Sequence, residues 1–194
     1  MNWRAIKKLL PIFHLKVSLP QHATSMKYLF LLTALFSLSS FILDEGNGIP
    51  SVDIKSLDGK SINTSEITND KKPIILCIWE MSCVPCVHEF DEISKQYENW
   101  QKETGVKIVA VSVDDNRNYS RVPSLVKSKG WKFEFYQDKT QDLKRALGVS
   151  VCPSTIIIDG KGEIVWRKSG YLRGDEETIY ETLQKVIKGE KVSD

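Results

Sequence analysis

Three largely apolar runs of strand length are spaced along the C-terminal two thirds of the chain. Residues 74–79 read Ile-Ile-Leu-Cys-Ile-Trp, and residues 106–113 and 155–158 are similarly apolar. A short run without regular polar alternation is typical of a strand that is buried on both faces, as in a parallel sheet covered by helices. These three segments therefore predict the centre of a sheet.

The pattern changes to a helical period after residue 86. Five large apolar residues fall on one face of a helix that should end near Gly105: Val87, Phe90, Ile93, Tyr97 and Trp100. Pro123 should open a shorter helix that stops near Gly130, and residues 142–147 predict one or two helical turns. The closing segment 175–187 is amphipathic, and its acidic residues favour the N-terminal end of a helix.

Weaker strand signals complete the pattern. Four short segments have the length and flanking turns of strands: 52–54, 61–63, 131–136 and 163–167. An Asp-Gly pair separates the first two, as in a β-hairpin, and a second Asp-Gly pair at 159–160 precedes the last. The order hairpin, β-α-β-α-β-α, β-β-α predicts an α/β domain with a central mixed β-sheet flanked by helices and an N-terminal β-hairpin extension.

The N-terminal region has a different character. Residues 28–43 contain no charged residue, basic residues precede them, and Asp44 and Glu45 follow. A basic segment, an apolar stretch and then small residues are typical of a secretory signal peptide, and the same stretch is nearly long enough for a membrane anchor. Both interpretations predict that the rest of the chain is exported to the periplasm or cell envelope.

The domain boundaries follow from this region. We expect residues 1–45 to be a signal peptide or N-terminal membrane anchor, and residues 46–194 to be one domain with its own core. Met26 begins a segment that would be a complete signal peptide by itself. This observation raises the hypothesis that residues 1–25 come from an upstream start codon.

Composition and charge exclude several classes of function. The formal net charge is only +2, with 27 basic and 25 acidic residues. No long run of like charge occurs in residues 46–194, so nucleic acid is not expected as a partner. The chain has four cysteines, Cys77, Cys83, Cys86 and Cys152, which are too few for a domain held together by disulfides. Their chemistry should therefore be redox or metal binding.

Cys83 and Cys86 are the strongest candidates for chemistry. They form a Cys-Val-Pro-Cys motif between a predicted buried strand and a predicted helix. The free amide groups and the dipole at a helix N-terminus stabilise a thiolate, so the pKa of Cys83 should be low. Pro85 suits the first helical turn because it has no amide proton to donate. Cys86, one turn further on, could resolve a mixed disulfide formed at Cys83.

A second motif supports this interpretation. Pro153 lies between a turn and an apolar strand, which makes the Cys152-Pro153 bond a candidate cis peptide. With this motif the chain resembles the thioredoxin superfamily, and within it the exported TlpA/ResA-like thiol–disulfide oxidoreductases. The resemblance covers about residues 48–188 and rests on these segments: 57–60, 78–79, 83–86, 89–90, 108–113, 151–155 and 159–163.

The resemblance implies a thioredoxin fold and a mechanism. Cys83 would be the attacking thiol, Cys86 the resolving thiol, and Pro153 a cis-proline that faces them and helps hold the backbone of a partner. The expected activity is exchange of disulfides with protein substrates, in the reducing direction and outside the cytoplasm. No organic cofactor is implied, because electrons would come from another thiol protein, a membrane thiol–disulfide electron donor. Residues 28–43 could tether the domain to the membrane.

Three positions differ from the pattern of this family. Ser82 precedes Cys83 where family members usually carry tryptophan, and Cys77 occupies a strand position where thioredoxins carry a buried aspartate. Since Cys77 cannot replace that acid, Glu89, three residues after Cys86, is the best remaining carboxylate for proton transfer. The alternative is that Glu89 is a solvated surface residue, and Cys77 is most simply an inert buried thiol.

Cys152, the third departure, leaves alternatives open. It should lie close to Cys83 and Cys86, where we expect it to pack as a small hydrophobe and modulate the redox potential. It could also complete a copper or zinc site with these two cysteines, although no second Cys-x-x-Cys supplies further ligands. A thiol peroxidase is less favoured, since the Pro-x-x-x-Thr-x-x-Cys context of peroxide-reducing relatives is absent before Cys83.

Overall fold

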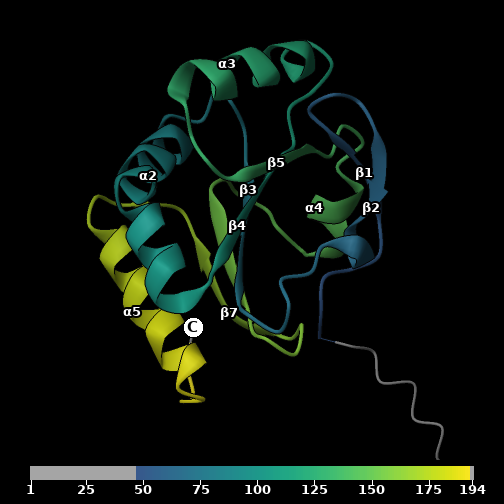
Figure 1. Cartoon of the computed structure of the whole chain (residues 1–194). Helices are drawn as coiled ribbons and strands as arrows, with labels where there is room; N and C mark the ends of the chain where they lie inside the picture. The colour runs from purple at the N-terminus through teal and green to yellow at the C-terminus, as the bar shows by residue number, and fades with distance from the viewer. Residues whose placement is uncertain (1–46, 193–194) are drawn as a thin grey trace, which may run out of the picture. The chain divides into compact units, whose positions relative to one another are not determined.

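The computed structural model describes residues 47–192, which form an α/β domain around one sheet (Figure 1). The strands of these residues are β1 (Asp53–Ser56), β2 (Ser61–Asn63), β3 (Ile74–Trp79), β4 (Lys107–Ser112), β5 (Glu134–Gln137), β6 (Ser154–Ile158) and β7 (Ile164–Ser169). They are arranged in the order β2-β1-β5-β4-β3-β6-β7. β3, β4 and β5 are parallel, whereas β1, β6 and β7 each pair antiparallel with their neighbours. The predicted mixed sheet with an N-terminal hairpin is confirmed.

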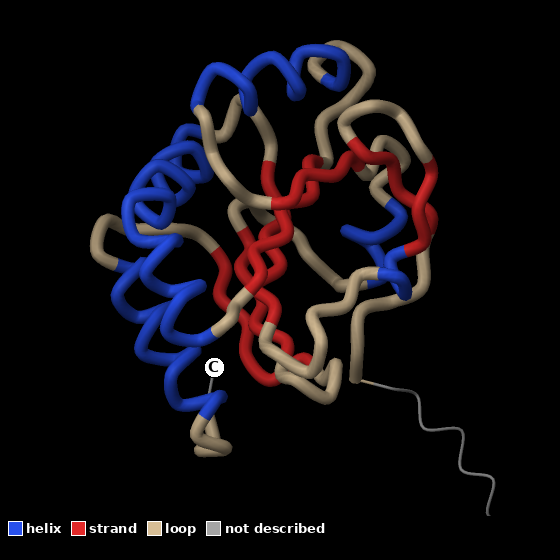
Figure 2. The backbone as a smooth tube through the Cα atoms, viewed as in Figure 1, coloured by secondary structure: helices blue, strands red, loops and turns tan. Residues whose placement is uncertain are grey.

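Helices cover both faces of the sheet. The helices are α2 (Val84–Thr104), α3 (Val122–Lys129), α4 (Asp142–Ala146) and α5 (Asp175–Ile187), with short 3-10 turns at Thr64–Glu66 and Tyr119–Arg121. Figure 2 shows α2 and α5 side by side along the same side of the strands, and residues of both belong to one core cluster. Leu143 of α4 belongs to a second cluster on the other face. The alternating side chains of β3 therefore reach two separate cores, as expected for a strand buried on both faces.

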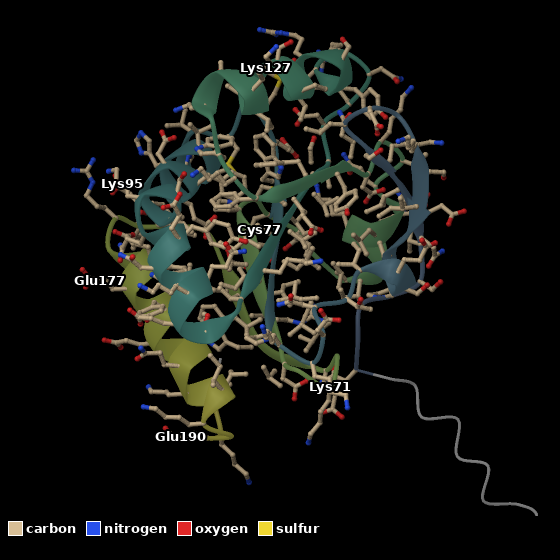
Figure 3. The ribbon with its side chains drawn as sticks, in the orientation of Figure 1. Lys71, Cys77, Lys95, Lys127, Glu177 and Glu190 are labelled. Atoms are coloured by element: carbon tan, nitrogen blue, oxygen red, sulfur yellow. A yellow bond between two sulfur atoms is a disulfide. The ribbon has the colours of Figure 1, made fainter. Side chains whose placement is uncertain are left out.

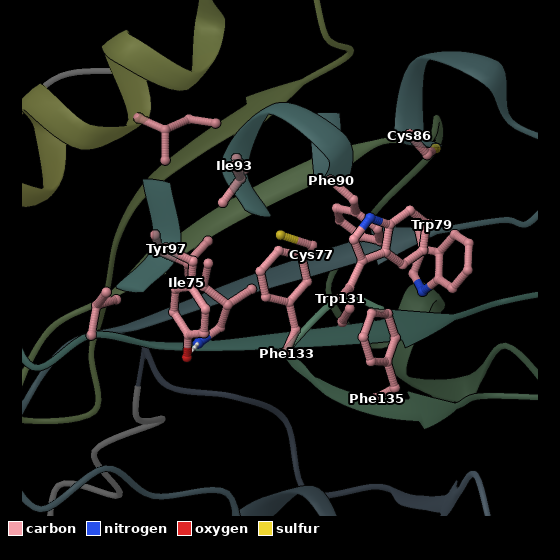
Figure 4. Close-up of a cluster of buried hydrophobic side chains, with 14 of the residues drawn as sticks. Ile75, Cys77, Trp79, Cys86, Phe90, Ile93, Tyr97, Trp131, Phe133 and Phe135 are labelled. Carbon is pink, nitrogen blue, oxygen red and sulfur yellow. Dashed lines mark hydrogen bonds between the residues drawn. The ribbon is translucent and has the colours of Figure 1, made fainter. Parts of the chain in front are cut away.

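Both cores meet at the central strand β3. Every residue of β3 is buried, and Cys77 lies in the middle of the sheet (Figure 3). Trp79 at the end of β3 packs edge-to-face with Phe90 of α2 and with Trp131, at ring-centroid distances of 5.2 and 5.9 Å (Figure 4). Such aromatic contacts each add about 0.5–1.5 kcal/mol beyond area burial. They fix the first turns of α2 against the end of β3.

The α2 helix follows the predicted pattern closely. It begins directly after Cys83 and ends at Thr104. The next residue, Gly105, caps the helix with a φ of 68°, a left-handed conformation that glycine adopts without strain. Its buried apolar face contains the predicted Phe90, Ile93, Tyr97 and Trp100. The helix therefore begins at the motif and aims its N-terminus at the cysteine pair.

One predicted strand needs correction, and two short turns were not predicted. The strand predicted over 131–136 begins only at Glu134, because Trp131 and Phe133 are buried in an aromatic cluster rather than in strand pairing. The two 3-10 turns have no counterpart among the predicted elements.

The apolar segment 28–43, the proposed start at Met26 and the leader 1–45 lie outside the described residues. Within 47–192, no helix has both the length and the apolar character needed to cross a bilayer.

Candidate active site

Cys83 and Cys86 are joined in a disulfide at the N-terminus of α2. The S–S distance is 2.02 Å and the Cα–Cα distance is 5.3 Å. Cys83 is the N-cap residue, and its sulfur accepts a hydrogen bond from the Cys86 backbone N–H at 3.2 Å. The predicted position of the motif between β3 and a helix is thus confirmed. A thiolate at Cys83 would receive this hydrogen bond and the positive end of the helix dipole.

The two cysteines differ in exposure. Cys83 is partly exposed, whereas Cys86 is fully buried. Between them Val84 is 64% exposed, although it is a large apolar side chain. Pro85 occupies the first turn of α2, where its missing amide proton costs no hydrogen bond. Only the Cys83 side of the disulfide is open to a second molecule.

Pro153 lies at the same end of the sheet as the cysteine pair. The Cys152-Pro153 peptide bond is cis, as predicted. β6 begins at the next residue, and Ser154 pairs with Ile78 near the end of β3. Pro85 and Pro153 line a common hollow of about 370 Å³, and Cys152 also lines it. The two motifs, almost 70 residues apart in the sequence, therefore share one surface.

Glu89 is buried beneath this surface and is not a surface residue. It is 1% exposed, and its Oε1 accepts a hydrogen bond from the Thr155 hydroxyl at 2.6 Å. Its Oε2 is buried and has no hydrogen-bond partner among residues 47–192. Burial raises the pKa of Glu89 from 4.5 to about 7, while the hydrogen bond from Thr155 opposes the shift. Glu89 is therefore a carboxyl group that can exchange a proton near neutral pH.

Cys77 is buried next to the same hydrogen bond. It pairs in register with Thr155 across β3 and β6, and its solvent exposure is 0%. Burial, followed by the charge of Glu89, raises the pKa of the Cys77 thiol well above its usual range. The prediction of a buried thiol is confirmed, and at this pKa Cys77 remains protonated at neutral pH.

Cys152 is half-buried and contacts both cores. It packs against the cluster that contains Cys86 and against the cluster on the opposite face. Burial, together with the negative charge of Glu80, raises the pKa of Cys152 to about 11. A thiol with this pKa is a poor nucleophile at neutral pH, because little thiolate is present.

Two residues of the site escaped the sequence analysis. Thr155 belongs to the predicted strand and to the segment 151–155, but the sequence assigned it no role of its own, although a polar residue directly after the Pro-Ser pair could have marked it. Asp114 is 3% exposed, and its Oδ2 accepts hydrogen bonds from the Met81 backbone N–H at 2.9 Å and from the Ser112 hydroxyl at 2.7 Å. It thereby attaches the loop before Cys83 to the end of β4. Its position directly after an apolar run is the available signal.

The arrangement of ligating side chains bears on the metal alternative. Within residues 47–192, no three His, Cys, Asp or Glu side chains come together in a group that could hold a metal ion. Cys83 and Cys86 are instead paired with each other.

Comparison with known proteins shows the family to which the chain belongs. A family model described as the AhpC/TSA family matches residues 46–167. The chain belongs to this family. It is 30% identical over 148 residues to the thiol-disulfide oxidoreductase ResA of Bacillus subtilis, an alignment that covers 76% of this chain and 79% of that protein. It is 33% identical over 137 residues to ResA of Halalkalibacterium halodurans, which covers 71% and 73% of the two chains.

A solved structure agrees with these relatives. An uncharacterised thioredoxin-like protein from Porphyromonas gingivalis has a TM-score of 0.66 and 36% identity, and the match covers 72% of this chain and 92% of that one. The predicted thioredoxin fold and the predicted family are confirmed. The protein is a thiol–disulfide oxidoreductase with a Cys-x-x-Cys disulfide at Cys83 and Cys86.

Proposed function

We propose that this protein is a reductase of protein disulfides that works outside the cytoplasm, with Cys83 as its attacking thiol. The difference in exposure between Cys83 and the buried Cys86 carries the assignment of roles. The basic, apolar and acidic order around residues 28–43 supports export. The relatives named ResA are thiol-disulfide oxidoreductases and support disulfide exchange. The reducing direction is what the resemblance to the TlpA/ResA-like proteins implies.

The reaction begins with both cysteines reduced. The Cys83 thiolate attacks one sulfur of the substrate disulfide, which forms a mixed disulfide and releases the other substrate sulfur as a thiolate. The Cys86 thiolate then attacks the Cys83 sulfur. The second substrate thiolate leaves, and the Cys83–Cys86 disulfide remains. The substrate gains two electrons, which the two cysteines of the protein lose.

Glu89 is the proposed proton acceptor for Cys86. The two residues are three apart on α2, so their side chains lie on the same side of the helix, and both are buried. A carboxylate with a pKa of about 7 is close to the pH at which a general base is most effective. When Glu89 takes the Cys86 proton, the resulting thiolate can complete the second step.

Pro153 and Cys152 have supporting roles in this proposal. Pro153 would help to hold the backbone of the partner against the hollow that it lines with Pro85. Cys152 remains a thiol, because its pKa of about 11 disfavours attack on the neighbouring pair. Its half-buried side chain would then influence the redox potential through packing.

The cycle needs an external source of electrons. A second thiol protein, which we propose to be a membrane thiol–disulfide donor, would reduce the Cys83–Cys86 disulfide again. Residues 28–43 would tether the domain near that donor. No organic cofactor takes part, since every electron moves between sulfur atoms.

Redox titration with thiol counting tests the proposal. The protein is equilibrated in glutathione or dithiothreitol buffers of graded potential, and alkylated cysteines are located by mass spectrometry. We expect one two-electron transition confined to Cys83 and Cys86. A potential near or below about −270 mV supports a reductase, and one near about −120 mV indicates an oxidant instead.

Variants separate the roles of the cysteines. Cys86→Ser should accumulate a mixed disulfide between Cys83 and a substrate peptide, while Cys83→Ser should form none. Cys152→Ser is the matched control and should keep the full cycle. Accumulation of the adduct in Cys83→Ser would reverse the assignment.

A further inference from the structure

A groove of about 790 Å³ adjoins the disulfide on the outer side of α2. His88 and Lys95 of α2 line one wall, Trp131 lines another, and the loop between β7 and α5 contributes Leu172 and Arg173. Leu172 also lines the hollow that contains Pro153. The groove and the hollow share Pro85 and Leu172 as lining residues, and Pro85 stands between the two cysteines in the sequence. A segment that reaches the disulfide could therefore continue into the groove.

Exposed apolar side chains gather at this junction. The large apolar residues that are most exposed within 47–192 are Val84, Val151, Leu172 and Ile187. Val84 lies between the two cysteines, Val151 precedes Cys152, and Leu172, at 76% exposure, lines both the groove and the hollow. Three of the four therefore surround one redox centre. Apolar groups concentrated at one exposed place are typical of a surface that contacts another protein.

Among the described residues, one of the cations that line the groove has no ionic partner. Asp91 is paired with Lys129 at 2.7 Å, and Glu92 is paired with Lys95 at 2.6 Å. Arg173 is exposed and makes no ion pair or hydrogen bond with the described residues. Since lysines neutralise both carboxylates inside the groove, the charge that remains for a bound molecule is the positive charge of Arg173.

We propose that this groove binds the chain segment that flanks the reactive cysteine of the protein substrate, and that Arg173 selects segments with an acidic residue. Leu172 and Val84 would contact the apolar part of the segment, and the Arg173 guanidinium would pair with its carboxylate. This inference rests on the proposed reduction of protein disulfides and adds to it a preference among substrates. The chemical step is the exchange already described, so no further reactant is needed.

Matched peptide disulfides test the preference. Two short peptides differ only in a Glu or a Lys placed three residues from the disulfide-bonded cysteine, and their reduction by the reduced full-length protein is followed by mass spectrometry. We expect the Glu peptide to react about two- to fivefold faster, the range of a single exposed ion pair. The ratio should approach one at high salt, because exposed charges are then screened.

Charge reversal at Arg173 gives the decisive comparison. Arg173→Glu should invert the ratio, so that the Lys peptide reacts faster. Lys127→Glu makes the same change in net charge on α3, where Lys127 is exposed and does not line the groove (Figure 3). This control should keep the ratio of the unmodified protein.

The outcomes separate this inference from the proposed function. If both peptides are reduced and Arg173→Glu does not change their ratio, the groove has no such role while the reductase assignment stands. If Lys127→Glu alters the ratio as much as Arg173→Glu does, net charge explains the preference and the groove proposal is wrong. If neither peptide is reduced by the unmodified protein, both proposals fail.

Discussion

Substitution of Glu89 by glutamine isolates the effect of its buried charge. The side chain keeps its shape and can still accept the hydrogen bond from Thr155, which joins residues 66 positions apart. The ability to ionise is lost. Because Glu89 is 1% exposed, solvent screens this charge very little. The variant should therefore differ from the unmodified protein mainly at the pH values where Glu89 is ionised.

The magnitude follows from the pKa shift. A rise from 4.5 to about 7 means that the folded protein holds the proton of Glu89 more tightly than the unfolded chain does. Between these two pH values the folded state binds more protons, so the free energy of unfolding falls as pH rises. At about 1.4 kcal/mol per pKa unit, the total loss is about 3 kcal/mol. Stability linked to Glu89 is thus full below pH 4.5 and lost above pH 7.

Urea unfolding of the oxidised protein between pH 4 and pH 8.5 measures this effect. The free energy of unfolding of Glu89→Gln, compared with that of the unmodified protein, should rise by about 3 kcal/mol between pH 4 and pH 8.5. Reduction of a peptide disulfide, measured in parallel, should lose its inflection near pH 7 and slow by about 10²-fold or more if Glu89 accepts the Cys86 proton.

A matched control is available on the same helix. Glu92 forms an exposed pair with Lys95, so Glu92→Gln should change stability by no more than about 0.5 kcal/mol. Parallel pH dependences for Glu89→Gln and the unmodified protein would show that folding does not raise the pKa of Glu89. If Glu89→Gln is stabilised at high pH but reduces the peptide at an unchanged rate, the pKa shift is correct and Glu89 does not accept the Cys86 proton.

Three further predictions concern neighbouring groups. Thr155→Val removes a hydrogen bond that lowers the pKa of Glu89, so the kinetic inflection should move above pH 7; an unmoved inflection would contradict this role. Asp114→Ala leaves the Met81 backbone N–H without its acceptor, and thermal unfolding should show a loss of about 1–3 kcal/mol, whereas no loss would mean that the loop finds another acceptor. The rate of alkylation of Cys152 in the oxidised protein, followed by peptide mass spectrometry, should rise with pH up to about pH 11. An inflection near the ordinary pKa of a free thiol would show that burial does not raise the pKa of Cys152.

Local sequence pattern was sufficient for most of the fold. The apolar run at 74–79 and the helical period after Cys86 predicted β3 and α2 almost to the residue, because each element is encoded by the spacing of its own side chains. The prediction was less accurate for β5. Its preceding aromatic residues, Trp131 and Phe133, have the composition of a strand, yet contacts with Phe90 of α2 decide their place.

The sequence alone also determined the chemistry of the motif. A strand, a cysteine pair and a helix start are consecutive in the chain, so the position of Cys83 at the helix N-terminus could be predicted without any long-range contact. The cis bond at Pro153 was likewise indicated by its local context. Such features depend on residues close in sequence, and for this reason they are readable from it.

Only the tertiary structure decided the environment of the remaining groups. Glu89 was equally compatible with a solvated surface position until the pairing of β3 with β6 brought Thr155 beneath α2. Within the part of the chain that the structure describes, Arg173 is left unpaired because Glu92 and Asp91 pair with Lys95 and Lys129 instead. Burial, pKa and charge pairing arise from contacts between residues far apart in the chain. Their physical cause, the exclusion of water and the meeting of opposite charges, exists only once the chain has folded.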